Sequence, residues 1–240
     1  MHGLPPTVTI DLREPVLAAY FRARVGQALH DSYAGAPLVK FPEDLRVYEH
    51  LLWVQAADTV VEVGTYGGGS ALWFRDRLRT LQAYGRSGRN PLVVSVDIDQ
   101  ADAADRLAAA DPGFAEQIRL VEGDVRDPST VAEVRRLVVR RPNCFVVEDS
   151  AHTYEATLAS LEAFADFVPV GGFMVVEDGC VDIDALRLAP DWPRGVLPAL
   201  HDWLATEAGR AFAVRRDLEL YGMACHPEGF LQRKSSAAAG

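Results

Sequence analysis

Five short apolar runs recur along the middle of the chain, and a stretch with a helical pattern of apolar positions lies between each run and the next. Each run is apolar throughout, which is typical of strands buried on both faces of a sheet. This alternation predicts an α/β fold with a doubly wound, mostly parallel sheet. The runs cover residues 59–63, 92–96, 118–121, 145–147 and 173–176, and the helices cover residues 70–81, 101–110, 130–139 and 151–167.

The segment before the first run has the pattern of two helices. Residues 14–29 are amphipathic, and a second helix is expected from Pro42 to about residue 56 or 57. Glu43 and Asp44 directly follow Pro42, and acids in the first turn suit the positive end of the helix dipole. We therefore expect residues 1–57 to form a helical cap on the main domain.

The alternation of strands and helices stops after Gly179. A further helix carries the apolar residues Leu197, Leu200 and Trp203. The stretch 180–194 is long for a loop, which makes it a candidate lid over the strand ends. Two or three strands that would close the sheet with an antiparallel hairpin are expected, around residues 212–216, 221–225 and 230–233.

Composition and charge limit the class of protein further. The 240 residues are 49% hydrophobic, enough for one large domain, which we place at residues 58–234, with a disordered tail at 235–240. The formal net charge of −10 disfavours nucleic acid and anionic membranes as partners. The three cysteines have no CxxC spacing and are expected to be reduced thiols of a cytoplasmic protein. Neither a signal-peptide pattern nor a membrane-spanning apolar run is expected.

A glycine-rich turn follows the first predicted strand and reads Glu62-Val63-Gly64-Thr65-Tyr66-Gly67-Gly68-Gly69-Ser70. Its glycines do not have the GxGxxG spacing of a dinucleotide site. An acid followed by such glycines fits the first motif of S-adenosylmethionine methyltransferases better, since a carboxylate suits an α-ammonium group and glycines allow close approach of a ligand. A tight turn without a ligand is the alternative. The candidate cofactor residues here are Glu62, Gly64, Tyr66, Gly68 and Ser70.

Acids also follow the next two predicted strands. The second strand ends in an Asp-Ile-Asp sequence at residues 97–99, where an acid typically accepts the ribose hydroxyls of a nucleoside. We place that role on Asp97, at the strand tip, rather than on Asp99. Asp124 follows the third strand and is the candidate partner of the adenine amino group. One such acid is weak evidence, but acids at successive strand ends are more specific.

The fourth and fifth predicted strands end in the acids of a candidate metal site. Asp149 follows the fourth strand, and Glu177 and Asp178 follow the fifth. Neighbouring strands end about 5 Å apart. At such distances like charges raise each other's pKa or need a cation between them. Three carboxylates favour a hard cation, Mg²⁺ first and then Mn²⁺ or Ca²⁺.

His152, three residues after Asp149, is the candidate general base beside this metal site. We expect it on the first turn of the following helix, with Asp149 serving catalysis as well as the metal. The alternatives are that Ser150 only caps that helix and that His152 is a surface or capping histidine.

Six motifs spread over most of the chain occur together. They are Lys40-Phe41-Pro42-Glu43-Asp44-Leu45, Glu62-Val63-Gly64 with the following glycines and Ser70, Ser95-Val96-Asp97, Asp149-Ser150 with His152-Thr153-Tyr154, Val176-Glu177-Asp178-Gly179 and Pro227-Glu228-Gly229-Phe230-Leu231-Gln232-Arg233. In these motifs the chain resembles the family of cephalosporin hydroxylases and rhamnosyl O-methyltransferases. The resemblance implies a Rossmann-like class I methyltransferase fold, S-adenosylmethionine as cofactor, and Mg²⁺ bound by Asp149, Glu177 and Asp178. It implies that His152 is the general base. It also implies homo-oligomers in which the N-terminal segment covers the site.

The predicted function is Mg²⁺-dependent methylation of a sugar hydroxyl, of the deoxysugar or rhamnosyl type, on a small-molecule natural product or glycolipid. Mg²⁺ on vicinal hydroxyls would acidify one of them, and His152 would take its proton. Vicinal hydroxyls also occur in catechols, so a non-sugar acceptor or an amine stays open. A non-catalytic S-adenosylmethionine-binding partner of a tailoring enzyme is a further alternative, which a base beside the acids argues against. The glycine spacing disfavours a nicotinamide oxidoreductase.

Six aromatic residues could stack on a sugar or macrocycle of the acceptor: Tyr33, Tyr66, Trp73, Tyr154, Trp192 and Trp203. Of these, Tyr154 and Trp192 are the ones to test. Trp73 and Trp203 lie on apolar helical faces and are expected in the core instead.

Overall fold

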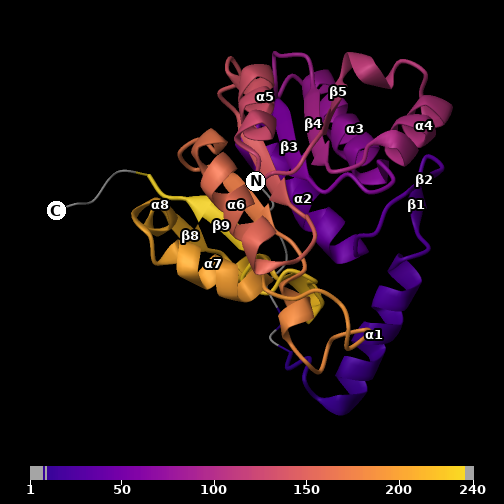
Figure 1. Ribbon diagram of the computed structural model, residues 1–240, viewed down its shortest axis with the longest axis vertical. Helices are drawn as coiled ribbons and strands as arrows, with labels where there is room; N and C mark the ends of the chain where they lie inside the picture. The colour runs from indigo at the N-terminus through magenta and orange to yellow at the C-terminus, as the bar shows by residue number, and fades with distance from the viewer. Residues whose placement is uncertain (1–7, 9, 236–240) are drawn as a thin grey trace.

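The five apolar runs form adjacent parallel strands of one seven-stranded sheet. In the computed structural model, which describes residue 8 and residues 10–235, the strand order is β5-β4-β3-β6-β7-β9-β8 (Figure 1). β9 pairs antiparallel with both β7 and β8, so the predicted doubly wound sheet with a C-terminal antiparallel pair is confirmed. The strands are β3 (Thr59–Val63), β4 (Leu92–Asp97), β5 (Ile118–Glu122), β6 (Cys144–Glu148), β7 (Phe173–Val176), β8 (Phe212–Val214) and β9 (Phe230–Arg233).

Helices cover both faces of the sheet, which explains why its strands are apolar without alternation. Val60 belongs to the core under α2, α3 and α4, whereas its neighbour Val61 belongs to the core under α5, α6 and α7. Successive strand residues point to opposite faces, so a strand covered on both sides needs apolar residues at every position. The helices are α2 (Pro42–Gln55), α3 (Gly69–Ala83), α4 (Ala101–Ala110), α5 (Pro128–Val138), α6 (Tyr154–Phe164), α7 (Val196–Leu204) and α8 (Glu207–Arg210).

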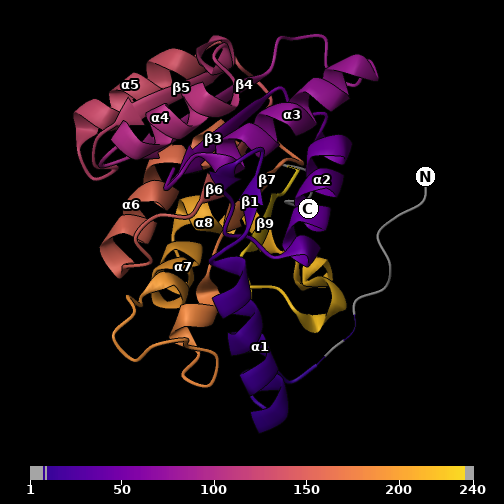
Figure 2. The same ribbon diagram turned by 90° about the vertical axis from the view of Figure 1, so that its right-hand side faces the viewer.

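The N-terminal segment reaches beyond the edge of the sandwich. Helix α1 (Pro15–Ala28) extends away from the sheet and lies beside the loop that precedes α7 (Figures 1 and 2). The Arg22 guanidinium donates to the carbonyl oxygen of Ala185 in that loop. A two-stranded antiparallel hairpin, β1 (Ser32–Tyr33) with β2 (Ala36–Pro37), connects α1 to α2 and was not expected from the sequence.

The predicted strand at 221–225 is wrong. Residues 220–222 form a short 3₁₀ turn, η5 (Leu220–Gly222), in which Tyr221 has a φ of 59° and Gly222 a φ of 63°. Two consecutive left-handed residues end an extended strand, so the chain turns here before β9. The other 3₁₀ turns are η1 (Phe114–Glu116), η2 (Ala165–Phe167), η3 (Gly179–Asp182) and η4 (Arg216–Leu218).

The start of α6 also differs from the expectation. The helix begins at Tyr154, and the side chain of Thr153 accepts a hydrogen bond from the backbone N–H of Ala156 at 3.4 Å. Ser150 does not cap it, because its hydroxyl donates to the Glu148 carboxylate. His152 has a φ of 58°, so it lies in the loop before the helix and not on its first turn.

Of the predicted tail 235–240, residues 236–240 lie outside the described residues, and the disorder of the tail stays a prediction. The division of the chain into a cap at 1–57 and a domain at 58–234 also stays a prediction. Within the described part of the chain, no helix is both long enough and apolar enough to cross a membrane.

Candidate functional site

The turn between β3 and α3 packs directly on the end of β6. Gly64 has a φ of +100°, and a Cβ atom at this position would lie 1.7 Å from the carbonyl oxygen of Asp149. The backbone N–H groups of Thr65 and Tyr66 donate to Asp97 Oδ2 at 2.9 and 3.0 Å. A residue without a side chain is therefore required at Gly64 to bring the turn, Asp97 and Asp149 together.

Gly64→Ala is expected to destabilise the fold by about 2–6 kcal/mol. The sum combines a left-handed backbone strain of about 1–3 kcal/mol with overpacking of about 1–3 kcal/mol. Gly35→Ala is the matched control, because Gly35 has a φ of +86° but a Cβ atom there would have nothing within 4 Å. Urea unfolding of both variants measures the difference. Equal destabilisation of the two would show that the contact with Asp149 does not matter.

A cavity of about 600 Å³, here called the larger cavity, opens over the carboxyl ends of the parallel strands. Ligands of open α/β sheets bind at this edge. Four predicted site residues do not line it: Glu62, Gly68, Ser70 and Glu177. Those that line it are Gly64, Tyr66, Asp97, Asp124, Asp149, His152 and Asp178.

Glu62 lies behind the glycine turn. Its carboxylate is fully buried and accepts a hydrogen bond from Ser95 Oγ at 2.7 Å. Burial raises the pKa of Glu62 to about 7, although Lys40 and hydrogen bonds from Ser70 and Ser95 oppose this rise. Its Oε1 has no hydrogen-bond partner among the described residues. Glu62 therefore supports the turn from inside the protein, while Gly68 is the N-cap residue of α3 and has a φ of 80°.

Asp97 and Asp124 both reach the larger cavity, but they differ in their surroundings. Both oxygens of Asp97 accept backbone N–H groups, from Thr65 and Tyr66 on one side and Ile98 on the other. Asp124 is held by the guanidinium of Arg126, which together with the Arg126 backbone N–H lowers the pKa of Asp124 to about 2. Both acids are thus fixed carboxylates at the predicted strand ends.

His152 stands between two of the predicted metal acids. Its Nε2 lies 3.3 Å from Asp149 Oδ1 and 3.3 Å from Asp178 Oδ2. Burial lowers the pKa of His152, but the hydrogen bond to Asp149 and the charges of Asp178 and Asp149 outweigh it and raise the pKa to about 9. One ligand atom from each of these three residues lies within 4.8 Å of the other two.

Lys40 and Tyr48 hold the third acid, and their roles were missed in the sequence. Lys40 Nζ lies 2.9 Å from Asp149 Oδ2 and 2.6 Å from Glu177 Oε1. The Tyr48 hydroxyl donates to the same Glu177 oxygen at 2.5 Å. Burial and the neighbouring Asp149 raise the pKa of Glu177, and Lys40 offsets part of that rise. The sequence signal was the motif that begins at Lys40, but nothing local linked this lysine to the acids.

His226 is a second histidine of the site that was missed. Its Nδ1 accepts the backbone N–H of Asp178 at 3.0 Å. Nε2 has no hydrogen-bond partner among the described residues and lies 3.6 Å from both Asp44 Oδ2 and Glu177 Oε2. Glu177, Asp178 and His226 form a second candidate ligand group, which shares Asp178 with the first.

A smaller cavity of about 260 Å³ adjoins the acids from the other side. Its wall is mostly apolar and comes from α1, the 180–194 loop and the segment around Phe41. Arg187 fixes the loop by donating to the carbonyl oxygens of Val181, Pro190 and Trp192 at 2.6–2.7 Å. The two cavities share four lining residues: Leu29, Val39, His152 and Asp178.

The structure separates the aromatic candidates. Trp192 lines the smaller cavity. Tyr154 lines neither cavity and donates its hydroxyl to Asp202 at 2.9 Å. Trp73 and Trp203 are buried in the core, as expected.

Known proteins with a similar sequence or fold can be compared with this chain. The chain is 27% identical over 206 residues to a rhamnosyl O-methyltransferase of Mycobacterium tuberculosis, covering 84% of this chain and 78% of the relative. A solved structure of CmcI with Mg and SAM matches with a TM-score of 0.59 and 24% identity over 86% of this chain and 78% of that one. MycE, solved with Mg and SAH, matches with a TM-score of 0.51 and 20% identity over 83% of this chain and 50% of MycE.

The decisive match is to a family model. The model of Rhamnosyl O-methyltransferase/CmcI matches residues 26–234, which include the glycine turn, the acids that follow β6 and β7, and β9. The chain therefore belongs to the rhamnosyl O-methyltransferase/CmcI family.

Proposed function

We propose that this methyltransferase is Mg²⁺-dependent and methylates a hydroxyl of a sugar, of the deoxysugar or rhamnosyl type, on a natural product or glycolipid. The observation that carries the proposal is that two cavities meet at His152 and Asp178. The larger one lies over the glycine turn, where the cofactor is expected. The smaller one brings an acceptor to the same acid–histidine cluster. A methyl donor and a hydroxyl need to meet at such a junction.

The residues of the larger cavity fit S-adenosylmethionine. Gly64 and Tyr66 supply backbone at the glycine turn, Asp97 suits the ribose hydroxyls, and Asp124 suits the adenine amino group. S-adenosylmethionine supplies the methyl group as a sulfonium. Support from relatives is that CmcI was solved with SAM and MycE with SAH.

The acids fit a hard divalent cation. The carboxylates of Asp149, Glu177 and Asp178 lie at the ends of the neighbouring strands β6 and β7, and Mg²⁺ prefers such oxygen donors. Asp149 and Asp178 belong to one candidate ligand group, with His152, and Glu177 and Asp178 belong to another, with His226. Lys40 neutralises only part of this charge, because it contacts Asp149 and Glu177 but not Asp178. Mg²⁺ held there would acidify an acceptor hydroxyl and fix its direction. CmcI and MycE were both solved with Mg.

The chain's own residues handle the proton. His152 is positioned at the junction of the cavities to take the hydroxyl proton onto Nε2, the atom that faces Asp149 and Asp178. The same two acids raise the pKa of His152, so cation charge beside them favours the unprotonated ring that a base requires. Lys40 and Tyr48 keep the Glu177 carboxylate in place, and His226 fixes the backbone of Asp178.

Trp192→Ala is expected to raise the KM for the acceptor by about tenfold or more, the usual cost of losing an apolar contact in a pocket. Trp192 lines only the smaller cavity, so the affinity for S-adenosylmethionine is expected to stay unchanged. Trp53→Ala is the control, because Trp53 packs edge-on against Tyr84 and lines neither cavity. Steady-state kinetics measure the split. A loss of affinity for S-adenosylmethionine with an unchanged KM for the acceptor would contradict the placement of Trp192 in the acceptor site.

In the direct test, the protein is incubated with S-adenosylmethionine, Mg²⁺ and each of a panel of acceptors. Mass spectrometry then detects SAH and the methylated acceptor. Methylation of deoxysugar glycosides, and not of matched aglycones, supports the proposal. Methylation of catechols or amines alone would move the activity to a non-sugar acceptor. Cofactor binding without turnover on any acceptor would favour the non-catalytic partner. Homo-oligomers, with α1 near the site, stay a prediction that sedimentation can check.

A further inference from the structure

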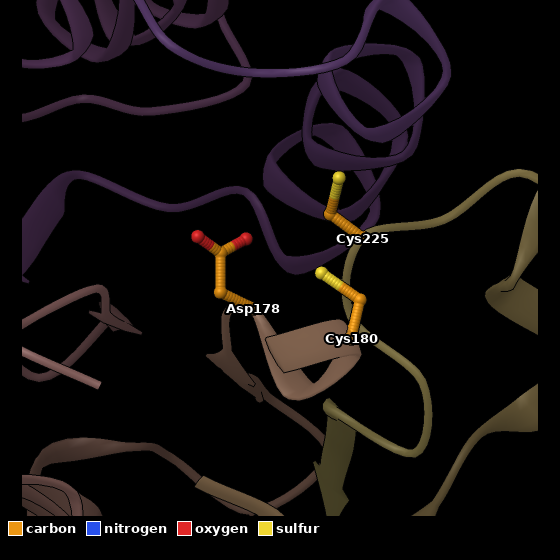
Figure 3. Close-up of side chains that lie close together, drawn as sticks. All are labelled: Asp178, Cys180 and Cys225. Carbon is orange, nitrogen blue, oxygen red and sulfur yellow. The ribbon is translucent and has the colours of Figure 1, made fainter. Parts of the chain in front are cut away.

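Two thiols lie beside Asp178 and have no role in the proposed reaction. Figure 3 shows the three side chains gathered together, with Asp178 and Cys180 around the short turn η3 and Cys225 on a separate segment before β9. The two segments are fixed to each other, since the backbone N–H of Cys180 donates to the carbonyl oxygen of Cys225 at 3.2 Å. One ligand atom from each of the three residues lies within 4.8 Å of the other two.

These thiols are buried in the protein and still border a cavity. Cys180 is 6% exposed and Cys225 8% exposed, and they form no disulfide. Both line the smaller cavity, as does Asp178. A small ion entering this cavity therefore meets two sulfur atoms and a carboxylate oxygen, whereas a large thiol reagent is sterically disfavoured.

We propose that Cys180, Cys225 and Asp178 form a binding site for a thiophilic divalent cation such as Zn²⁺ or Cd²⁺. Sulfur ligands select such ions, whereas Mg²⁺ prefers oxygen and is selected by the neighbouring acids. Zn²⁺–sulfur bonds are about 2.3 Å long and Zn²⁺–oxygen bonds about 2.0–2.2 Å, so ligand atoms this close need only small rotations to hold one ion. The cavity leaves the fourth position open.

Binding of a divalent cation at this site involves no change of oxidation state. Each thiol loses its proton to solvent, two sulfur–metal bonds and one oxygen–metal bond form, and no electron donor or acceptor is required. Asp178 also belongs to the ligand groups of the proposed Mg²⁺ site. A thiophilic ion that holds Asp178 would therefore oppose Mg²⁺ binding, and only this consequence rests on the proposed function.

The test is a titration of the reduced, metal-free protein with Cd²⁺, followed by the ultraviolet charge-transfer band of cadmium–thiolate bonds. A phosphine keeps the thiols reduced without competing as a thiol. The band is expected to saturate at one Cd²⁺ per chain, to be lost in the Cys180→Ser and Cys225→Ser double variant, and to persist in Cys144→Ser. Cys144 is the matched control, because its buried thiol lies near the start of β6 and donates to the carbonyl oxygen of Arg141 at 3.2 Å.

Asp178→Asn is expected to weaken Cd²⁺ binding about tenfold or more, since even outer partners of metal sites carry effects of that size. A second readout uses wild-type protein and so does not depend on a variant that folds. The protein is alkylated while it unfolds, and mass spectrometry reads which thiols react. One equivalent of Cd²⁺ should protect Cys180 and Cys225, but not Cys144.

Absence of the band in wild-type protein, or an equal band in the double variant, would overturn the proposal. The titration contains no S-adenosylmethionine. A protein that shows the band but does not bind the cofactor would therefore support this site while refuting the proposed function.

Discussion

His152→Ala is expected to lower turnover by about two to four powers of ten, the range for removal of a general base. S-adenosylmethionine binding should stay close to wild type, because the glycine turn and Asp97 do not depend on this side chain. The reason for the loss is position: His152 is the only histidine of the described chain that lines both cavities. Single-turnover kinetics with saturating cofactor measure the effect on the chemical step.

His201→Ala is the matched control for this prediction. His201 is exposed, pairs with Glu228 at 3.1 Å and lines neither cavity, so its loss should leave turnover unchanged. Near wild-type turnover in His152→Ala would remove the base from the account, and an equal loss in both variants would point to stability instead.

Asp178→Asn is expected to abolish stimulation by Mg²⁺ and to reduce the rate to that of chelator-treated enzyme, about a hundredfold or more below wild type. Asp178 is the acid that both ligand groups of the site share, and it is the acid that Lys40 does not contact. Asparagine keeps the shape of the side chain and removes its charge, so the loss reports on the metal. Rates at increasing Mg²⁺ concentration measure the stimulation.

Asp184→Asn is the control, because the Asp184 side chain is 86% exposed and, among the described residues, its ion pair is with Arg194 on the surface. Its Mg²⁺ response should match wild type. Full activity of wild-type enzyme after thorough chelation would be incompatible with a metal-dependent reaction.

Charge balance explains why the acids of this site can be buried. The Glu177 side chain is 1% exposed. Lys40, whose side chain is only 2% exposed, forms ion pairs with both Glu177 and Asp149. Buried charges are tolerated when they are paired and hydrogen-bonded. Lys40 and Tyr48 satisfy Glu177, and Lys40 with His152 keeps the pKa of Asp149 below its usual value despite burial. Asp178 is not contacted by Lys40 and faces His152 Nε2 at 3.3 Å, so a cation can meet its charge when that ring is unprotonated.

The strands and their burial on both faces could be predicted from the sequence because each needs apolar residues at every position. The acids at the strand ends followed from the same argument, since parallel strands end at one edge of the sheet. Family membership, the fold class and the enzyme class are confirmed. The expected strand at 221–225 failed because left-handed backbone at Tyr221 and Gly222 is invisible in a hydrophobic pattern.

The rest of the site depends on contacts between residues far apart in the chain. Lys40 is 109 residues from Asp149 and 137 from Glu177, and His226 is 48 residues from Asp178. No local pattern encodes such pairings, because they arise only when the segment before α2 and the segment before β9 pack around the strand ends. His152 was placed correctly beside the acids but wrongly on a helix, since Thr153 rather than Ser150 provides the cap.

Isothermal titration of the chelator-treated protein, first with S-adenosylmethionine and then with Mg²⁺, tests the central claim most directly. The account predicts saturable binding of the cofactor, followed by a metal-binding event that is present in wild type and in Asp184→Asn but lost in Asp178→Asn. Cofactor binding with no metal event in wild type would contradict the metal-dependent mechanism, and absence of cofactor binding would contradict the methyltransferase site itself.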